Sequence, residues 1–477
     1  MNNTFEVVVV GGGISGLTAC YYLQESGKRS GLNLHLTLIE AGARLGGKVL
    51  TDRINGFVIE AGPDSFFTQK PWALDLCKEL GLSERLVKAN QETKGTFILN
   101  KGKLSKLPEG TETGTPANIR PFISTDLISP LGKLRALMDF IVPRRKEKED
   151  ESVADFFNRR FGKEFLEKIA EPLFAGIYAG DVNYLSMKAV LPRFAELESA
   201  HGSLIRSISR ARKKMKQSSQ PGAVPAFFTL KDGLAELIDT LISHLDNTTI
   251  LLNKSVTRLL PRDLENKSRL GLVLDDGKEM RPYAIVLTTP AYVTEKLVRY
   301  IDEETAKLLA MIPYVSTATV SLAFRENELG TKLEGHGFLV PRNASEIVTG
   351  CTWSSSKWPG HSPSGTILVR CFCGWAGHED FFQLDDVALV KKVREFLSRI
   401  AHISGTPMLV KVYRMKQALP QYNVGHLGCI LELEEKLRND GLFVTGAAYH
   451  GVGLPDCVHD AELTAQKIVK ELIESNK

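Results

Sequence analysis

Three glycines near the start of the chain have the spacing of a dinucleotide-binding turn. An apolar run at 7–10 leads into Gly11-x-Gly13-x-x-Gly16, a helical pattern follows, and a second apolar run ends at Glu40. In such a unit the first glycine permits a tight turn, the second lets the backbone approach a pyrophosphate, and the third lets the helix pack on the strand. The phosphates bind at the positive N-terminal end of that helix. Glu40, at the tip of the second strand, is placed to accept hydrogen bonds from the adenosine ribose.

A second glycine motif follows Glu40 directly and bears on which dinucleotide is bound. Arg44-Leu45-Gly46-Gly47 completes an ExxxRxGG pattern, which resembles the superfamily of FAD-containing amine oxidases and porphyrinogen oxidases. The paired glycines would let the backbone approach the flavin side of the cofactor, and Arg44 could neutralise phosphate charge. The resemblance favours FAD over NAD.

Composition places the chain among ordinary soluble enzymes. With 477 residues, two or three domains are expected, and a net charge of +4 predicts no general nucleic-acid role. The seven cysteines lack the regular spacing of a disulfide framework, and a reducing compartment fits them best. Cys371-x-Cys373 lies in an alternating apolar stretch, so we interpret it as two residues on the same face of a strand. A metal or redox pair is the alternative.

The ends and charged segments of the chain bear on its location. MNNTFE lacks the basic region of an export signal, and no run of about 18 apolar residues predicts a membrane span. We therefore expect a cytoplasmic protein, with peripheral membrane contact left open. The segment 206–216, RSISRARKKMK, carries six basic residues and no acid. Two interpretations stay open: a mobile solvated loop, or a patch for an anionic membrane surface, an acidic substrate or a protein partner.

The nucleotide-binding motif is confined to the start of the chain, so later segments must complete that domain. Asp275-Asp276-Gly277 predicts a hairpin turn, and an apolar strand follows that ends at Pro290. Residues 442–475 predict a short strand, a glycine-rich turn and a long helix, which can direct a second helix N-terminus at the cofactor. The apolar positions of this helix are Leu463, Ile468, Val469 and Leu472.

Two different patterns lie between these segments. Residues 100–225 are mostly helical, with loops at 111–116 and 143–151, whereas residues 305–417 alternate as a mixed sheet does, with one helix near 385–401. The predicted fold class is therefore α/β and α+β, with a Rossmann-like FAD-binding domain that is discontinuous in the sequence. We expect an FAD-binding domain from 1–69, 226–300 and 418–477, a mixed-sheet substrate-binding domain from 70–95 and 301–417, and a helical lobe, associated with membrane or substrate, from 96–225.

Three further segments resemble one family within the superfamily. Residues 60–66 (EAGPDSF), 171–181 (EPLFAGIYAGD) and 419–426 (LPQYNVGH) are similar to elements of the FAD-dependent protoporphyrinogen/coproporphyrinogen oxidases of haem biosynthesis. The segments CTWSSSKWP and GVGLPDC resemble the soluble enzymes of Gram-positive bacteria in that family. One departure is Cys20, where the first helix usually carries Ala or Gly. A buried cysteine is a small hydrophobe, so the packing should survive.

The resemblance implies a reaction. It is the oxidation of coproporphyrinogen III to coproporphyrin III in repeated two-electron steps, with hydride equivalents passing to flavin N5, oxygen as acceptor and hydrogen peroxide released. Protoporphyrinogen IX is the alternative substrate, and transient contact with other haem-synthesis enzymes is expected. Because formation of the aromatic product supplies the driving force, the protein's task is mainly to position the reactants and to stabilise charge electrostatically. The sequence contains no clear acid–base dyad, metal cluster or nucleophile motif, and we interpret His450 as a structural residue rather than a base.

The motifs and the resemblance together supply the candidate cofactor-binding residues. Backbone N–H groups around 451–453, with the start of the following helix, would stabilise the negative charge of reduced flavin. The full set is Gly11, Gly13, Ile14, Ser15, Gly16, Glu40, Ala41, Arg44, Gly46, Gly47, Lys48, Gly62, Pro63, Asp64, Val256, Thr289, Gly446, Gly451, Val452 and Gly453.

Candidate substrate-binding residues are fewer. Lys70 matches the position where the family places a basic residue near substrate carboxylates, although a solvated surface lysine is the alternative. Ile177 is a candidate wall of the apolar slot that a flat macrocycle needs, or else an ordinary core residue. The aromatic residues Phe338, Trp353 and Trp358 could add flat apolar surface or belong to the core.

Two other functions stay open. A flavin amine oxidase or carotenoid desaturase shares the glycine motifs, but an amine oxidase needs an aromatic cage, to which Tyr449 contributes at most one residue. A non-catalytic FAD-containing scaffold in a haem-synthesis assembly is the second alternative. Assays with porphyrinogens and amines, and the detection of peroxide, separate these readings.

Overall fold

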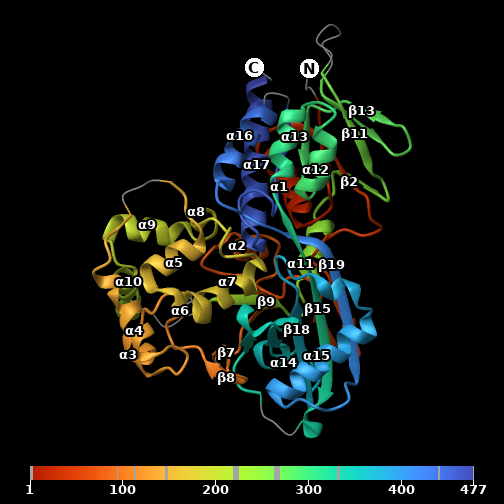
Figure 1. Cartoon of the computed structure of the whole chain (residues 1–477). Helices are drawn as coiled ribbons and strands as arrows, with labels where there is room; N and C mark the ends of the chain where they lie inside the picture. Colours follow the sequence, from red (N-terminus) through yellow and green to blue (C-terminus); the bar gives the residue numbers. More distant parts are fainter. Residues whose placement is uncertain are drawn as a thin grey trace.

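Three regions make up the computed structural model of the chain. It describes residues 4–93, 95–111, 114–145, 149–218, 225–262, 269–329, 333–438 and 441–475. Figure 1 shows a region with both termini at the top, a mostly helical lobe at the lower left, and a sheet region at the lower right. Among the described residues, no helix combines the length and the apolar character that crossing a membrane requires.

A five-stranded parallel sheet forms the centre of the first region. Segments that are far apart in the sequence pair side by side in the order β10-β2-β1-β14-β20. The buried apolar runs of β1, β2, β14 and β20 are typical of parallel strands covered on both faces, whereas the edge strand β10 has no buried residue. The strands are β1 (Thr4–Val10), β2 (Asn33–Glu40), β10 (Thr248–Leu252), β14 (Ala284–Leu287) and β20 (Leu442–Val444).

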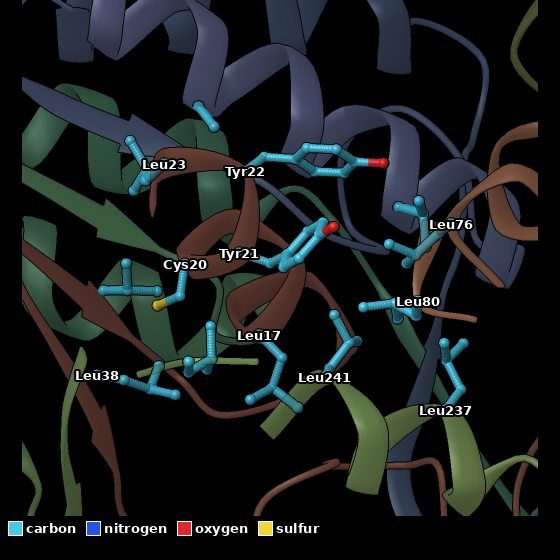
Figure 2. Packing of buried hydrophobic residues seen from close by; sticks show 14 of the residues in the cluster. Leu17, Cys20, Tyr21, Tyr22, Leu23, Leu38, Leu76, Leu80, Leu237 and Leu241 are labelled. Carbon is cyan, nitrogen blue, oxygen red and sulfur yellow. The ribbon is translucent and has the colours of Figure 1, made fainter. Parts of the chain in front are cut away.

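Two long helices, α1 (Ile14–Ser30) and α17 (Leu454–Ser475), pack against each other beside this sheet. Figure 2 shows Cys20 of α1 among buried leucines, and its side chain is completely buried, as expected for a small hydrophobe. On α17 three of the four predicted apolar positions are buried. The fourth, Leu463, is 40% exposed. It lies off the stripe at 461, 464, 465, 468, 469 and 472 that helical periodicity turns inward.

Smaller elements complete the first region. The strands β12 (Gly271–Leu274) and β13 (Glu279–Met280) form the predicted hairpin, with Gly277 at a φ of +83° in its turn. Around them lie β11 (Val256–Leu260), α11 (Ala235–Ser243), α12 (Ala291–Val298), α13 (Glu303–Ala310) and α16 (His426–Arg438).

A seven-stranded sheet with the order β19-β15-β18-β17-β16-β7-β8 forms the second region. Only the β16–β7 pairing is parallel among the pairings of this sheet in the described residues, so the sheet is mixed, and α15 (Asp386–Ala401) is the predicted helix. The hairpin β7–β8 falls within the predicted helical range 96–225 but pairs with this sheet. The strands are β7 (Phe97–Asn100), β8 (Lys103–Lys106), β15 (Tyr314–Arg325), β16 (Gly337–Leu339), β17 (Val348–Trp353), β18 (Thr366–Cys373) and β19 (Leu409–Pro420).

Several apolar side chains of this region belong to its core. Cys371 and Cys373 are alternate, fully buried residues of β18 and are free cysteines, as the strand interpretation expects. Phe338, Trp353 and Trp358 are at most 2% exposed. These aromatic rings are therefore core residues, and the interpretation as slot surface is wrong for them because solvent does not reach them.

Short elements connect the sheets. The strands β3 and β4 form a hairpin, and β5, β9 and β6 form a small three-stranded sheet. Their bounds, with two adjoining helices, are β3 (Thr51–Ile54), β4 (Phe57–Glu60), β5 (Phe66–Phe67), β6 (Leu86–Lys88), β9 (Phe227–Leu230), α2 (Trp72–Glu79) and α14 (Ser354–Lys357).

The third region is the helical lobe. Its core is rich in phenylalanine, with rings of Phe157, Phe161 and Phe165 in mutual contact. The predicted loops 111–116 and 143–151 lie only partly within the described residues. The helices are α3 (Ile119–Ser124), α4 (Pro130–Leu137), α5 (Val153–Phe161), α6 (Lys163–Phe165), α7 (Glu171–Tyr178), α8 (Met187–Val190), α9 (Pro192–His201) and α10 (Leu204–Ser218).

The basic segment 206–216 lies in α10, so the interpretation as a mobile loop is wrong. The helix forms because Leu204, Ile205 and Ile208 recur at helical spacing and pack against the core of the lobe. Its basic side chains at 206, 210 and 213 are exposed, whereas the structure describes only the backbone at 212, 214 and 216.

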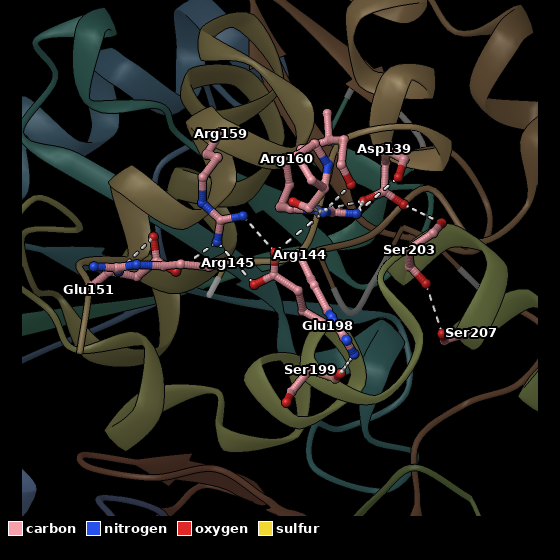
Figure 3. Close-up of polar contacts among 12 residues, drawn as sticks. Asp139, Arg144, Arg145, Glu151, Arg159, Arg160, Glu198, Ser199, Ser203 and Ser207 are labelled. Carbon is pink, nitrogen blue, oxygen red and sulfur yellow. Dashed lines mark hydrogen bonds and ion pairs between the residues drawn. The ribbon is translucent and has the colours of Figure 1, made fainter. Parts of the chain in front are cut away.

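A buried ion pair fixes the helices of the lobe. Arg160 and Asp139 have completely buried side chains, and Arg160 Nε donates to Asp139 Oδ1 at 2.7 Å. Ser203 Oγ and the backbone N–H of Ile205 donate to Asp139 Oδ2 at 2.6 and 3.0 Å, as Figure 3 shows in part. Neighbouring Arg159 pairs with Glu198 (Figure 3). Buried charges are tolerated only when paired in this way.

Candidate cofactor and substrate site

The carboxyl end of β1 carries the glycine turn. Gly11 has a φ of +109°, which favours glycine, and a Cβ on Gly16 would lie 1.9 Å from the carbonyl oxygen of Gly11. A Cβ on Gly13 would meet nothing within 4 Å, although Gly13 is the N-cap of α1. Packing therefore requires two of the glycines, while the space in front of Gly13 is open, as a phosphate at the helix N-terminus requires.

Glu40 orders this turn from the second strand. Its Oε2 accepts a hydrogen bond from the N–H of Gly12 and its Oε1 from the N–H of Gly42, both at 2.7 Å. The exposed Ala41 lies between these contacts. Since an ionised carboxylate has about four acceptor positions, Glu40 retains capacity for ribose hydroxyls while two amides hold its orientation.

The second glycine motif lies directly against the first. Gly46 N–H donates to Gly12 O at 2.7 Å, and a Cβ on Gly47 would lie 3.1 Å from Gly13 Cα. Gly46 and Gly47 both have positive φ values. Arg44 donates to the carbonyls of Leu45, at 3.0 Å, and Gly47, so its guanidinium orders the loop from within.

Lys48 follows this loop and lies in an unusual environment. Solvent reaches its side chain, yet the surrounding protein is dense enough that desolvation lowers its pKa. Its Nζ donates to the carbonyl of Ala418. An accessible lysine within dense protein indicates an open space of the kind that a cofactor fills.

The segment 62–64 approaches Lys48 closely. A Cβ on Gly62 would lie 2.0 Å from the Lys48 carbonyl oxygen, and Pro63 follows it half-buried. Asp64 pairs with Lys357 at 3.2 Å. Although burial alone would raise the pKa of Asp64, Lys357 and Arg370 hold it below its usual range. The Asp64 charge therefore anchors the segment within the protein.

Two glycine turns after β20 complete the arrangement. Asp460 Oδ2 accepts hydrogen bonds from Gly446 N–H at 3.0 Å and Thr445 Oγ1 at 2.7 Å, and a Cβ on Gly446 would lie 3.5 Å from Ser15 Oγ. Gly451, at a φ of +153°, donates its N–H to the Tyr422 hydroxyl at 2.8 Å. Val452 and Gly453 lead into α17. Because Cys457, in the first turn of α17, is hydrogen-bonded to Ser15, the N-terminal turns of α1 and α17 meet at one place.

The remaining predicted cofactor residues adjoin the same place. Lys254 N–H donates to the carbonyl of Glu40 at 3.1 Å, which brings Val256 near the end of β2. A Cβ on Gly11 would lie 3.3 Å from the backbone nitrogen of Thr289. Thr288, which the sequence reading missed, donates its hydroxyl to Gly11 O at 2.8 Å. Nothing in its local sequence distinguishes Thr288 from other strand-end threonines.

The structure brings Lys70 to the start of α17. Its Nζ lies 2.7 and 2.9 Å from the two carboxylate oxygens of Asp456, and a Cβ on Gly451 would lie 2.4 Å from Asp456 Cβ. Lys70 is about half exposed, so the alternative of a free surface lysine is replaced by an ion pair beside the glycine turn. A substrate carboxylate at Lys70 would share its charge with Asp456.

Ile177 is 58% exposed at the C-terminal end of α7, which rules out the interpretation as a core residue. Val452, from the glycine turn, packs against the same cluster as Tyr178, the next residue. The predicted slot residue and the predicted flavin turn therefore lie in one neighbourhood.

His450 and Tyr449 are structural. His450 Nε2 lies 2.6 Å from Glu434 Oε1, and this hydrogen bond raises the pKa of His450. Tyr449 is completely buried, with its hydroxyl 3.4 Å from Thr294 Oγ1. A buried tyrosine cannot line an open aromatic cage, which weighs against the amine oxidase alternative.

Known proteins resemble this chain along nearly its whole length. The family model described as flavin containing amine oxidoreductase matches residues 14–469. The chain belongs to this family. It is 38% identical to coproporphyrinogen III oxidase from Bacillus subtilis (strain 168) over 95% of each chain. It is 31% identical to protoporphyrinogen oxidase 1, chloroplastic, from Arabidopsis thaliana, over 98% of this chain and 88% of that protein.

A solved structure agrees with this assignment. A protein from Exiguobacterium sp. 255-15, assigned as a protoporphyrinogen oxidase, superimposes with a TM-score of 0.85 at 33% identity, over 98% of this chain and 99% of that chain. The predicted fold class is confirmed, and the protein is an FAD-dependent oxidoreductase. The open space before Gly13, the accessible Lys48 and the two converging helix N-termini fit this cofactor.

Proposed function

We propose that the protein oxidises coproporphyrinogen III to coproporphyrin III, with oxygen as electron acceptor. The observation that carries this proposal is the near-full-length similarity to a coproporphyrinogen III oxidase, which exceeds that to the plant protoporphyrinogen oxidase. The reaction removes six hydrogens from the macrocycle, so three oxygen molecules become three molecules of hydrogen peroxide. Bound FAD supplies the two-electron redox chemistry.

The chain's own groups bind and orient the cofactor in this proposal. N–H groups of Ile14 and Ser15, at the start of α1, face the pyrophosphate, and Glu40 accepts from the adenosine ribose. Residues 44–48 and 62–64 hold the flavin side. The N–H groups at 451–453 and the positive end of α17 stabilise negative charge on the reduced ring, which makes the cofactor a stronger oxidant.

Lys70 and Ile177 orient the substrate in this proposal. Lys70 binds a propionate carboxylate beside Asp456, and Ile177 forms an apolar wall for the flat macrocycle. Lys70→Ala should raise KM for coproporphyrinogen III while FAD content stays near normal, because the lysine binds substrate and not cofactor. An unaltered KM would remove Lys70 from the substrate site.

A competition assay tests the substrate. Purified holoenzyme receives coproporphyrinogen III and protoporphyrinogen IX together, and product fluorescence and peroxide are followed. We expect a higher kcat/KM for the substrate with four propionates and three peroxides for each porphyrin formed. A preference for protoporphyrinogen IX would assign the alternative substrate, turnover of amines alone would assign an amine oxidase, and no turnover would favour a scaffold.

We also propose that the helical lobe makes peripheral contact with a membrane surface. Leu131, Leu134 and Ile141 are 64–80% exposed within one short stretch. The exposed basic residues of α10 lie nearby, since the Arg206 guanidinium lies 5.9 Å from the Phe140 ring centroid. An apolar face flanked by cations is typical of helices that lie in a membrane interface.

Vesicle flotation tests this contact. The holoenzyme should float with phosphatidylglycerol vesicles more than with phosphatidylcholine vesicles, and Leu131→Glu/Leu134→Glu should remove the difference. Val387→Glu is a matched control, because Val387 is 79% exposed on α15, outside the lobe. Equal flotation of the double variant and the control would contradict the proposal.

A further inference from the structure

The chain turns sharply at the end of α7, and three successive carbonyls of this turn are held by side chains or backbone from another region. Tyr178 O accepts from Gln421 Nε2 at 3.0 Å, and Ala179 O accepts from the N–H of Ala376 at 2.8 Å. Gly180 O accepts from the guanidinium of Arg342. The acceptors belong to the helical lobe, whereas the donors follow β19, β18 and β16. We call these three contacts the carbonyl clamp.

Arg342 is the charged member of the clamp, and its side chain is 10% exposed. Its Nε lies 3.4 Å from Glu171 Oε1 and its Nη1 3.3 Å from Asp181 Oδ1. Glu171 begins α7 and Asp181 follows its end, so one guanidinium contacts both ends of the helix. The guanidinium also lies 4.1 Å from the ring centroid of Trp375, beside Ala376.

The position of this cation has an electrostatic reason. The last carbonyls of a helix lack partners within the helix and carry partial negative charge. Because its donors point in several fixed directions, the planar guanidinium donates to the Gly180 carbonyl while its charge lies within 3.4 Å of Glu171 and Asp181. The chain bends at Ala179 with a φ of +47°, a conformation that is costly for alanine unless its surroundings hold it.

The clamp also connects the end of α7 to the flavin turn. Gln421 holds Tyr178, and the adjacent Tyr422 donates its hydroxyl to Ala447 O at 2.7 Å while it accepts from Gly451 N–H at 2.8 Å. Two consecutive residues therefore contact both the proposed substrate wall and the proposed flavin turn.

We propose that Arg342 is a positioning residue that sets the width of the porphyrinogen slot. It holds the end of α7, and with it Ile177, at a fixed distance from Gly451–Gly453. This inference rests on the proposed function, because it takes Ile177 as the substrate wall. A displacement of about 1 Å at such a wall weakens productive substrate binding strongly, without change to the cofactor.

Steady-state kinetics of Arg342→Gln and Arg342→Lys holoenzymes test the proposal. Arg342→Gln should raise KM for coproporphyrinogen III about tenfold, with kcat within about twofold and with FAD content unchanged. Arg342→Lys should raise KM less than Arg342→Gln does, because lysine keeps the positive charge but lacks the planar guanidinium. Gln421→Met, which removes the donor to Tyr178, should raise KM in the same direction, and it tests the clamp if Arg342→Gln does not fold.

Arg414→Gln is the matched control. Arg414 donates to the carbonyls of Phe381 and Leu384, at 3.0 and 2.8 Å, and pairs with Asp386 at 2.8 Å, but all these partners lie within the sheet region. We expect both Arg414→Gln and Arg342→Gln to lower Tm, but only Arg342→Gln to raise KM. An unchanged KM in both clamp variants, or an equal KM rise in the control, would overturn the proposal. Absence of porphyrinogen turnover by the wild-type enzyme would instead overturn the proposed function, and this inference with it.

Discussion

The parallel-sheet region and the helical lobe are specified in different ways. In the first, the proposed cofactor site consists mostly of backbone: glycine turns and two helix N-termini beside an aliphatic core. In the second, side chains far apart in the sequence set the geometry, through Asp139 with Arg160 inside the lobe and Arg342 at its attachment. A site built from backbone turns leaves a local pattern of glycines in the sequence. A site built from paired side chains leaves no such pattern.

The largest effect should come from Gly16→Ala. The added Cβ would lie 1.9 Å from a backbone oxygen that cannot move without displacement of β1, so we expect a loss of about 4 kcal/mol or more of unfolding free energy. Chemical denaturation and FAD absorbance measure it. Gly428→Ala, in α16 with open space around its Cβ, is the control and should be neutral or slightly stabilising. A stable Gly16→Ala holoenzyme would contradict the importance of backbone packing here.

Arg160→Met tests the side-chain network of the lobe. It leaves the Asp139 carboxylate buried and without its cation, which typically costs about 3–5 kcal/mol. Thermal unfolding should show the loss, while the FAD spectrum of the folded fraction stays unchanged because the pair lies in another region. Arg399→Met removes a pair whose arginine is 58% exposed, and it should cost less than about 1 kcal/mol. Similar losses in both variants would mean that the buried ion pair contributes no more to the free energy of unfolding than an exposed one.

The same division explains what the sequence could predict. The strand–turn–helix of β1 and α1, the hairpin around Gly277 and the helix α15 each follow from a local pattern, and each is present. The interpretation of 206–216 as a mobile loop is wrong because it gave more weight to the density of basic residues than to the helical spacing of the apolar residues Leu204 and Ile208. Each of these elements lies within a few turns of chain, where periodicity carries the information.

Contacts between residues far apart in the chain could not be predicted from the sequence. Gln421 and Tyr422 lie inside a segment quoted for its family resemblance, but their partners are about 240 and 25–30 residues away. Asp139 lies between Met138 and Phe140, and Arg160 follows a second arginine, so neither stands out in the sequence from other polar residues. Because the partner of a buried charge is chosen by the fold and not by spacing, no local signal identifies such pairs.

Glu60→Gln sharpens the comparison, since Glu60 is a buried side chain on β4 that accepts a hydrogen bond from Leu234 N–H at the start of α11 in the parallel-sheet region. Burial raises the pKa of Glu60 to about 7, against the lowering effect of hydrogen bonds from Leu234 N–H and Thr51. The unfolded carboxyl ionises near pH 4.5, so the folded state holds an extra proton between these values. The contribution of Glu60 to stability is therefore complete below pH 4.5 and is lost as pH rises towards 7, by about 3 kcal/mol.

Denaturation at pH 5, 6, 7 and 8 measures this effect. Wild type should lose stability over that range, and Glu60→Gln should show a shallower decline, because the amide does not titrate. Glu25→Gln, at an exposed helix position paired with Lys28, should keep the wild-type slope. A wild-type slope in Glu60→Gln would mean that Glu60 is ionised at all these values.

Gly13→Ala should have the smallest effect on folding stability but should clearly weaken FAD binding. Gly13 has a φ of −73°, which alanine adopts readily, and its Cβ would meet no protein atom within 4 Å. We expect the apoprotein to unfold within about 0.5 kcal/mol of wild type. FAD should bind far more weakly, because the methyl group would occupy the space through which the pyrophosphate approaches the backbone. Titration of apoprotein with FAD, beside a Tm measurement, separates the two quantities. Normal FAD affinity would place the pyrophosphate elsewhere, and the glycines of this turn would then serve packing alone.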